Sequence, residues 1–357
     1  MLLLLVYGCV SLQSDGTDSL EQRDYYESIT EQDIQLAPTS FDVGIWIQKV
    51  YAFDPQTKTF SADGYAWLKW KGEIEAWDEV TSQQPAKTIE FLNAVDQWDL
   101  VLELSPEMPY VDAGGWNYQA VVFSGRFLAN DLDLHRFPFE DITLPIEIET
   151  DDFWITDVML TNDQSGSSGV SEKSTLQGYA YKGFQTKTRK HIYRTSMGLN
   201  ADAQQYFGDP NIAKYPNFVA EVTYERINLS SFWQLFVPLL AVMGITIITP
   251  LIDPRSSDTK IAIPASVILA LVFLQDGYRQ MLPDSLAYLT YMDQLYGIAY
   301  AVSIIVFVES IWFTNILNDL DESEEQGVVN RIKRIEQRLH VGLLTLSLLV
   351  PIGIWYA

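Results

Sequence analysis

The chain has 357 residues, of which 48% are apolar and 13% aromatic, so it can bury a sizeable core and is neither disordered nor collagen-like. It carries 47 Asp and Glu against 23 Lys and Arg, a net charge of −24, which argues against nucleic acid as a partner. Its single cysteine, Cys9, excludes an internal disulfide and a cysteine-rich zinc site. We also expect no enzyme, because the sequence contains no P-loop, GxSxG or HExxH motif.

Residues 1–36 are expected to be an export-signal remnant followed by an acidic leader. A short apolar run over residues 1–6 leads to Cys9, which a lipoprotein signal would acylate. A truncated or misassigned start is the alternative. Residues 12–36 are polar and acidic.

Residues 37–226 contain short runs of alternating apolar and polar residues with turn signals between them. This density of strands without intervening helices predicts an extracellular, Ig-like antiparallel β-sandwich. The first 226 residues hold 16 Lys and Arg against 35 Asp and Glu, as expected for a domain that faces water. The predicted strands include residues 43–51, 64–70, 88–95, 117–128, 143–148, 178–195 and 218–226.

Residues 227–357 contain four apolar segments, at about 230–252, 258–281, 288–318 and 331–357. A bilayer core requires about 20 residues of helix, and residues 232–252 contain no charge. We therefore predict a four-helix transmembrane bundle. Buried helices of a soluble protein are the alternative, which the lack of a polar face on the first and last segments disfavours.

Basic residues flank the inner ends of these segments, with Arg255 and Lys260 in one link and Lys333 and Arg334 in another. Because Lys and Arg near helix ends favour the cytoplasmic side, both the acidic domain and the C-terminus are expected outside the cytoplasm. We predict a multi-pass protein in contact with lipid in a bacterial inner membrane, with these parts periplasmic or extracellular.

In the second apolar segment, residues spaced three or four apart, several of them polar or acidic, would lie on one face of a helix, which is typical of a pore lining. Leu269 and Phe273 could form an apolar gate, and Asp258 could form a ring of carboxylates that selects monovalent cations. The alternative for Asp258 is a plain helix cap. The predicted pore-lining residues are Asp258, Ala262, Ser266, Leu269, Phe273, Asp276 and Gln280.

Several motifs resemble the pentameric ligand-gated ion channels (Cys-loop receptors), and in particular their prokaryotic members, which lack the two loop cysteines as this chain does. The sequence at residues 137–140, Phe-Pro-Phe-Glu, is similar to the FPFD signature of that family. The further matches are Arg226 before the first segment, Pro238 within it, Leu282-Pro283 after the second, and Lys260, Ser266, Val267, Leu269 and Leu271 inside the second.

The resemblance implies a homopentamer with a central pore lined by the second segment. Agonist would bind between subunits in the β-sandwich. The absence of the Pro-Ala insertion that anion channels carry before the second segment, where Ser257-Asp258-Thr259 stands here, implies cation selectivity. The coupling residues implied are Asp54, Phe137, Pro138, Phe139, Glu140, Arg226 and Pro283.

The agonist site is similar to that of bacterial amine-gated channels, whose aromatic faces bind an organic cation by cation–π attraction. Trp46 and Tyr65 match one face, and Glu149 and Tyr215 match the other. Asp151 takes the place of the loop B aromatic residue, with Phe153 and Trp154 displaced, and Ser124 takes the place of an asparagine. The implied agonist residues are Trp46, Tyr65, Ser124, Glu149, Asp151, Phe153, Tyr193, Tyr206 and Tyr215.

Other stimuli stay open at this point. His135 adjoins the predicted coupling loop and could sense protons. Glu149, Asp151 and Asp152 lie close enough in sequence to bind a modulatory Ca2+, and no other cofactor is expected. A membrane-anchored β-sandwich that binds a solute without conducting ions is the alternative function.

Overall fold

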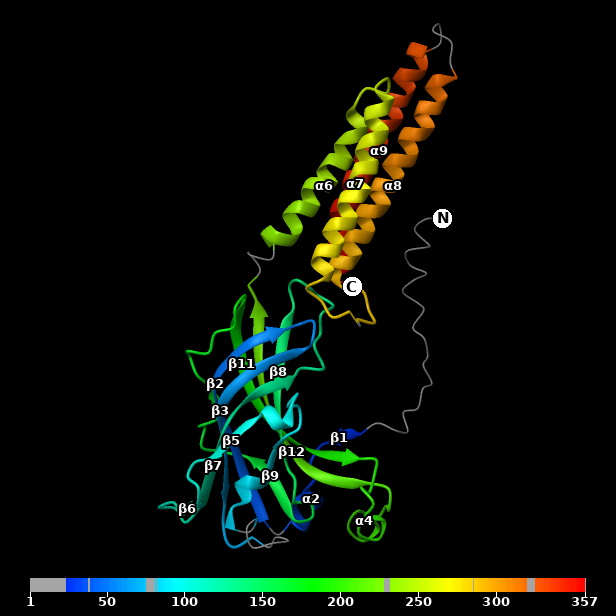
Figure 1. Cartoon of the computed structure of the whole chain (residues 1–357). Helices are drawn as coiled ribbons and strands as arrows, with labels where there is room; N and C mark the ends of the chain where they lie inside the picture. Colours follow the sequence, from blue (N-terminus) through cyan, green and yellow to red (C-terminus); the bar gives the residue numbers. More distant parts are fainter. Residues whose placement is uncertain are drawn as a thin grey trace.

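The computed structural model describes residues 24–37, 39–74, 81, 83–227, 232–284, 286–319 and 325–356. The expected export signal, including Cys9, lies outside these residues. The described chain forms a β-sandwich followed by a bundle of four long helices (Figure 1).

One layer of the sandwich is a five-stranded sheet in the order β1-β11-β12-β8-β4, with all its pairings antiparallel. Its two edge strands have three residues each, whereas its three central strands have 10 to 15. The bounds are β1 (Tyr25–Glu27), β4 (Ile89–Phe91), β8 (Asp141–Thr150), β11 (Tyr179–Tyr193) and β12 (Ala213–Arg226).

The other layer is a seven-stranded sheet with the central order β10-β2-β3-β7-β5, to which β6 and β9 add at β7 and β2. Strands β9 and β10 run parallel to β2, which departs from the purely antiparallel prediction. The chain crosses from one sheet to the other after β8 and therefore does not return as a hairpin. The bounds are β2 (Thr39–Asp54), β3 (Thr59–Trp70), β5 (Val101–Leu104), β6 (Tyr110–Val111), β7 (Asn117–Leu128), β9 (Val158–Asn162) and β10 (Gly169–Val170).

The core lies between the sheets because inward residues alternate with outward ones along each strand. On β2, Phe41, Val43, Ile45 and Ile47 are fully buried. Gly44 leaves room for the Trp67 ring, since a Cβ at position 44 would lie 2.2 Å from it. Burying apolar surface stabilises a fold by about 25 cal/mol per Å2, so this core is the main stabilising feature of the domain.

The sandwich also contains short helical segments: α2 (Glu31–Leu36), η2 (Pro85–Thr88), η3 (Gln97–Asp99) and α4 (Asn200–Phe207). The bundle begins with a π-helical turn, η4 (Phe232–Phe236), which leads into α6 (Val237–Ile248) and η5 (Thr249–Leu251). The long helices α7 (Ser257–Arg279), α8 (Tyr291–Asn318) and α9 (Glu325–Tyr356) follow.

Four helical stretches are long and apolar enough to cross a membrane: Trp233–Leu251, Ser257–Arg279, Tyr291–Asn318 and Gln326–Trp355. In α9 only 6% of the apolar window is buried inside the protein. Such a surface needs a cover other than water. The C-terminus lies at the end of the bundle next to the sandwich (Figure 1).

The loop between β7 and β8, residues 129–140, joins the sandwich to the helices. Phe139 lies 5.4 Å from Phe236 and 5.5 Å from Trp355 between ring centroids, so it contacts both the start of the bundle and its end. Phe137 is buried and stacks against Tyr278 of α7. The Tyr291 N–H donates to the His135 carbonyl at 2.7 Å.

The predicted coupling residues Asp54 and Pro283 also lie at this junction, but Gln56, which the sequence analysis missed, makes the contact. Its side-chain amide donates to the Gln280 carbonyl. Asp54 instead shapes the β2–β3 turn by accepting from the Gln56 N–H at 2.9 Å and the Thr57 hydroxyl at 2.8 Å. Pro283 is buried in the α7–α8 linker.

A buried ion pair holds the last strand of the sandwich to the 129–140 loop. Arg226, the final residue of β12, lies 2.9 Å from the Glu140 carboxylate and donates to the Tyr179 hydroxyl at 3.1 Å. Its guanidinium also lies 4.9 Å from the Phe137 ring centroid. Burial raises the pKa of Glu140, against the lowering effect of Arg226. Close contact between the two groups is therefore required, because either charge without its partner would destabilise the fold at this position.

We predict that Arg226→Met lowers the free energy of unfolding of the sandwich by about 3 kcal/mol, because it leaves Glu140 buried without its partner. Removing the cation raises the folded-state pKa of Glu140 further. A raised carboxyl pKa contributes stability at low pH that is lost as pH rises through it, so the deficit should shrink in acid. Chemical denaturation followed by tryptophan fluorescence measures both effects.

Adding Glu140→Gln to Arg226→Met should recover part of the lost stability. Arg126→Met is the matched control, because Arg126 pairs with Asp96 at 3.1 Å on an exposed surface. Equal losses for the two arginine variants would contradict a special role for the buried pair.

Candidate functional site

The first candidate site is one face of α7. All seven predicted pore-lining residues are exposed in the single subunit, including Leu269 at 58% and Phe273 at 68%. The opposite side of the helix packs against the rest of the bundle through Lys260, Val267 and Leu271. The exposed face is acidic or polar at both ends and apolar in the middle. It is accessible to whatever lies beside α7, namely a pore, lipid or another subunit.

Local hydrogen bonds leave acceptor oxygens on this face. The Ser266 hydroxyl donates to the Ala262 carbonyl at 2.8 Å, so its oxygen lone pairs stay available to a cation. At the C-terminal end of α7, the Gln280 side-chain amide donates to the Asp276 carboxylate at 3.1 Å. A groove of about 580 Å3 between α6 and α7 reaches the same face, and Val242, Asp258 and Ser266 are among its lining residues.

The nearby cation Lys260 does not join this face. Its side chain is 5% exposed and its ammonium donates to Glu336 of α9. Asp258, two residues earlier, is exposed in the first turn of α7. The N-terminal end of the exposed face therefore presents a carboxylate, while the lysine charge is neutralised inside the bundle. Nothing in the sequence pattern predicted the pairing with Glu336, because 76 residues separate it from Lys260.

The second candidate site surrounds the buried carboxylate of Glu149 on β8. This carboxylate accepts hydrogen bonds from His191 Nδ1 at 2.6 Å, the Tyr193 hydroxyl at 2.9 Å and the Asn217 side-chain amide at 3.1 Å. Asn217 lies on β12, the strand next to β8, and His191 and Tyr193 lie on β11, the strand beyond it. Glu149 is thus held in one orientation.

Aromatic side chains gather beside Glu149. The rings of Tyr193 and Tyr215 are 5.5 Å apart, and the Trp154 indole N–H donates to the Tyr215 hydroxyl at 3.0 Å. Tyr206 of α4 packs edge-on against Trp154 at 5.1 Å.

Phe153 does not join this cluster, so the prediction that it contacts agonist was wrong. It is 1% exposed and lies 5.8 Å from Phe41 in the core. Trp154, the next residue, takes the place in the cluster. The sequence showed two adjacent aromatic residues and could not tell which would turn inward.

The surroundings of the cluster are anionic. Glu90 of β4 is directly opposite Glu149 in the sheet, and Asp151 is exposed nearby. The pKa of Glu90 is raised mainly by burial and further by the charges of Asp151 and Glu149. The pKa of Tyr193 is raised mainly by burial and further by the charge of Glu149. Aromatic rings with an excess of carboxylates suit an organic cation.

The other predicted agonist residues belong to the seven-stranded sheet. Trp46 and Tyr65 are cross-strand partners on β2 and β3, and the two residues are 38% and 37% exposed. Ser124 on β7 donates its hydroxyl to Asp63 at 2.7 Å. Each subunit therefore carries the two aromatic sets on different sheets.

The three carboxylates of the expected calcium site are not brought together within one subunit. The described part of the chain contains no group of three or more His, Cys, Asp or Glu side chains placed to hold a metal ion. Glu149 is enclosed by its three donors, whereas Asp151 and Asp152 are exposed, and Asp152 accepts from the Thr81 hydroxyl at 3.1 Å.

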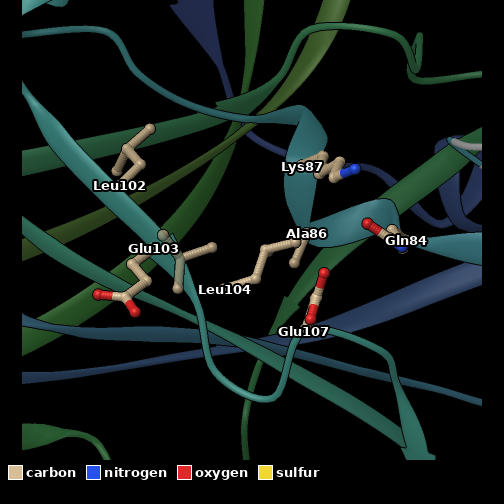
Figure 2. A pocket seen from close by; sticks show the side chains of 8 residues that line it. Gln84, Ala86, Lys87, Leu102, Glu103, Leu104 and Glu107 are labelled. Atoms are coloured by element: carbon tan, nitrogen blue, oxygen red, sulfur yellow. The ribbon is translucent and has the colours of Figure 1, made fainter.

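A separate cavity of about 480 Å3 lies where η2 meets β5 (Figure 2). It combines apolar side chains with charges of both signs, namely Lys87, Glu103 and Glu107. None of the predicted agonist or pore residues lines it.

Comparison with known proteins finds channel relatives. A proton-gated ion channel of Gloeobacter violaceus is 24% identical over 211 residues, which are 55% of this chain and 57% of that protein. A gamma-aminobutyric acid receptor subunit beta-like protein of Drosophila melanogaster is 23% identical over 193 residues, 53% of this chain and 34% of that protein. The chain thus spans less than two thirds of either relative, and no protein-family model matches it.

Both relatives are channels or receptor subunits, and the order of a β-sandwich followed by four apolar helices agrees with the motifs at residues 137–140 and 226. The resemblance drawn from the sequence is confirmed, and the chain is a distant homologue of the pentameric ligand-gated ion channels.

Proposed function

We propose that five copies of this chain form a cation-selective channel whose pore is lined by α7 and which opens when a ligand binds between subunits of the β-sandwich. The observation that carries the proposal is the exposed face of α7, with Asp258 at one end, Asp276 at the other and apolar residues between them. A ring of such faces forms a wet pathway with an apolar constriction.

The second candidate is a membrane-anchored receptor that binds a solute without conducting. The same face of α7 argues against it. A helix that serves only as an anchor has no reason to expose Asp258, Ser266 and Asp276 together, because carboxylates facing lipid are costly.

Cation selectivity follows from the charges at the inner end of α7. A ring of Asp258 carboxylates would attract cations and repel anions. The burial of Lys260 against Glu336 keeps the nearest lysine from opposing that field. Further along the pore, rings of Leu269 and Phe273 would close it to water at rest.

An organic cation is the proposed agonist. The Glu149 cluster of one subunit would face Trp46 and Tyr65 of the next, since the two sets occupy different sheets. Aromatic rings and fixed carboxylates on both sides of an ammonium group stabilise it by cation–π and ion-pair attraction.

Protons are a second candidate stimulus, favoured by the position of His135. Its ring stacks on Tyr288 of the α7–α8 linker at 3.8 Å, and its Nδ1 lies 2.7 Å from Asp133. Hydrogen bonds from His135 lower the pKa of Asp133, which stays ionised beside it. Arg136 is the neighbouring cation on the loop. A charge gained here would act directly on the junction between sandwich and helices.

We also propose a multi-pass bacterial inner-membrane protein with its sandwich and C-terminus outside the cytoplasm. The C-terminus lies beside the sandwich (Figure 1), and Lys333 and Arg334 lie at the opposite end of α9. Basic residues favour the cytoplasmic side of the membrane.

The test of the channel is the current through purified protein in a voltage-clamped bilayer with a tenfold NaCl gradient. The current should reverse near the sodium potential, about 59 mV. Asp258→Lys should move the reversal potential toward that of chloride. Asp253→Lys is the control, because Asp253 pairs with Lys333 outside α7 and carries the same charge change. Equal shifts in both variants would refute the Asp258 ring.

If the amine site is correct, primary alkylammonium ions applied to the side of the membrane that carries the sandwich should evoke current. Glu149→Gln should raise the half-activating concentration more than about tenfold, because the fixed negative charge is lost. Unit conductance should not change. Glu221→Gln, on the same sheet but paired with Lys187, should leave both values near those of the wild type. An unchanged dose–response curve in Glu149→Gln would place the agonist elsewhere.

The proton pathway predicts that lowering the outer pH evokes current in the wild type and that His135→Gln moves or abolishes this response. His340→Gln is the control, because His340 lies on α9 and its Nδ1 is 2.6 Å from the Ile247 carbonyl. A pH response with the same midpoint in the wild type and His135→Gln would remove His135 as the sensor.

A further inference from the structure

The N-terminal part of the described chain is docked on the hairpin that carries the second candidate site. We call residues 24–36 the strap. Its strand β1 extends the five-stranded sheet by pairing antiparallel with the end of β11, with Tyr26 opposite His191 and Glu27 opposite Lys190. Its helix α2 then follows, with a capping box made by Thr30 and Asp33.

Complementary charges hold the strap in place. Lys190 is buried and forms ion pairs with Glu27 at 3.3 Å and Asp33 at 2.9 Å, both in the strap. The backbone N–H of Arg194 also donates to the Asp24 carboxylate at 3.0 Å, and the Arg194 guanidinium lies 5.0 Å from the Tyr25 ring centroid. The acidic strap therefore binds a basic stretch of β11, just before the connection to β12.

Tyr26 links the strap to the candidate agonist site. Its ring stacks on the His191 imidazole with centroids 4.5 Å apart, and the Arg189 guanidinium lies 3.4 Å from the Tyr26 ring centroid. His191 in turn donates to Glu149 at 2.6 Å. Removing the Tyr26 ring would free one face of the imidazole that orients Glu149.

The strap is also a weak element. Strand β1 has three residues and is an edge strand, and short edge pairings open more readily than central strands. A hairpin held by such an edge can be released without unfolding the sandwich.

We propose that the strap restrains the β11–β12 hairpin and that Tyr26 is a positioning residue, which acts through His191 to hold the Glu149 carboxylate for an organic cation. The role of Glu149 in this inference rests on the function proposed above. The restraint of the hairpin does not. The two parts therefore need separate readouts.

The first experiment is hydrogen–deuterium exchange on the full chain in lipid nanodiscs without ligand. In Tyr26→Ala, the amides of residues 190–216 should exchange about tenfold faster than in the wild type, with β8 and α7 unchanged. Tyr26→Phe keeps the stacked ring and should behave as the wild type. Tyr110→Ala, an exposed tyrosine on β6, is the control.

Unchanged exchange over residues 190–216 in Tyr26→Ala would overturn the restraint. Faster exchange throughout the sandwich would also overturn it, since that indicates general destabilisation. Loss of protection in Tyr26→Phe equal to that in Tyr26→Ala would assign the effect to the hydroxyl, which donates to Glu147 at 3.2 Å, and would overturn the role of the ring.

The second experiment adds butylammonium and measures protection of the same amides. Tyr26→Ala should need about tenfold more butylammonium than the wild type for half protection, and Tyr26→Phe should not. Equal concentrations in all three proteins would overturn the positioning role. Absence of protection in the wild type would overturn the amine site and with it the positioning of Glu149, while the exchange without ligand still decides the restraint.

Discussion

The ion pair between the half-buried Arg226 guanidinium and the buried Glu140 carboxylate is the constraint on which the arrangement of the two domains depends. Arg226 ends β12, the strand that leads to the helices, and its partners Glu140 and Tyr179 belong to the 129–140 loop and to β11. A buried charge without its partner is costly, so the ion pair favours keeping these three segments together. Phe139 of the same loop packs on Phe236 at the start of the bundle and on Trp355 at its end, so the loop contacts both.

One side of α7 is packed inside the bundle, whereas the other is exposed. One side is packed into the bundle and includes Lys260, whose charge is neutralised by Glu336. The other side leaves Asp258, Leu269 and Phe273 without cover from their own chain. The apolar residues of that face favour contact with one another or with lipid, whereas the carboxylates need water. A shared aqueous axis between several copies satisfies both, and this is why we interpret the face as a pore lining.

The acidic residues of this chain occur in two different environments. Part of the acid is neutralised within the chain, as where Glu27 and Asp33 enclose Lys190. Elsewhere it is concentrated, as where Glu90 and Glu149 oppose one another between two strands. Like charges directly opposite each other destabilise a sheet, and the three hydrogen-bond donors around Glu149 offset part of this repulsion. The net charge of the chain alone could not separate these two uses.

The sequence by itself determined the features that depend on local spacing. These are the four apolar segments and the stripe from Asp258 to Gln280, because helical periodicity places such residues on one face whatever surrounds it. Long-range pairing decided the rest. It turned Phe153 inward and Trp154 toward Tyr215, placed Lys260 against a glutamate 76 residues away, and joined Tyr26 to His191. A strand pattern defines two faces but not its neighbours, since register is set by segments distant in the chain.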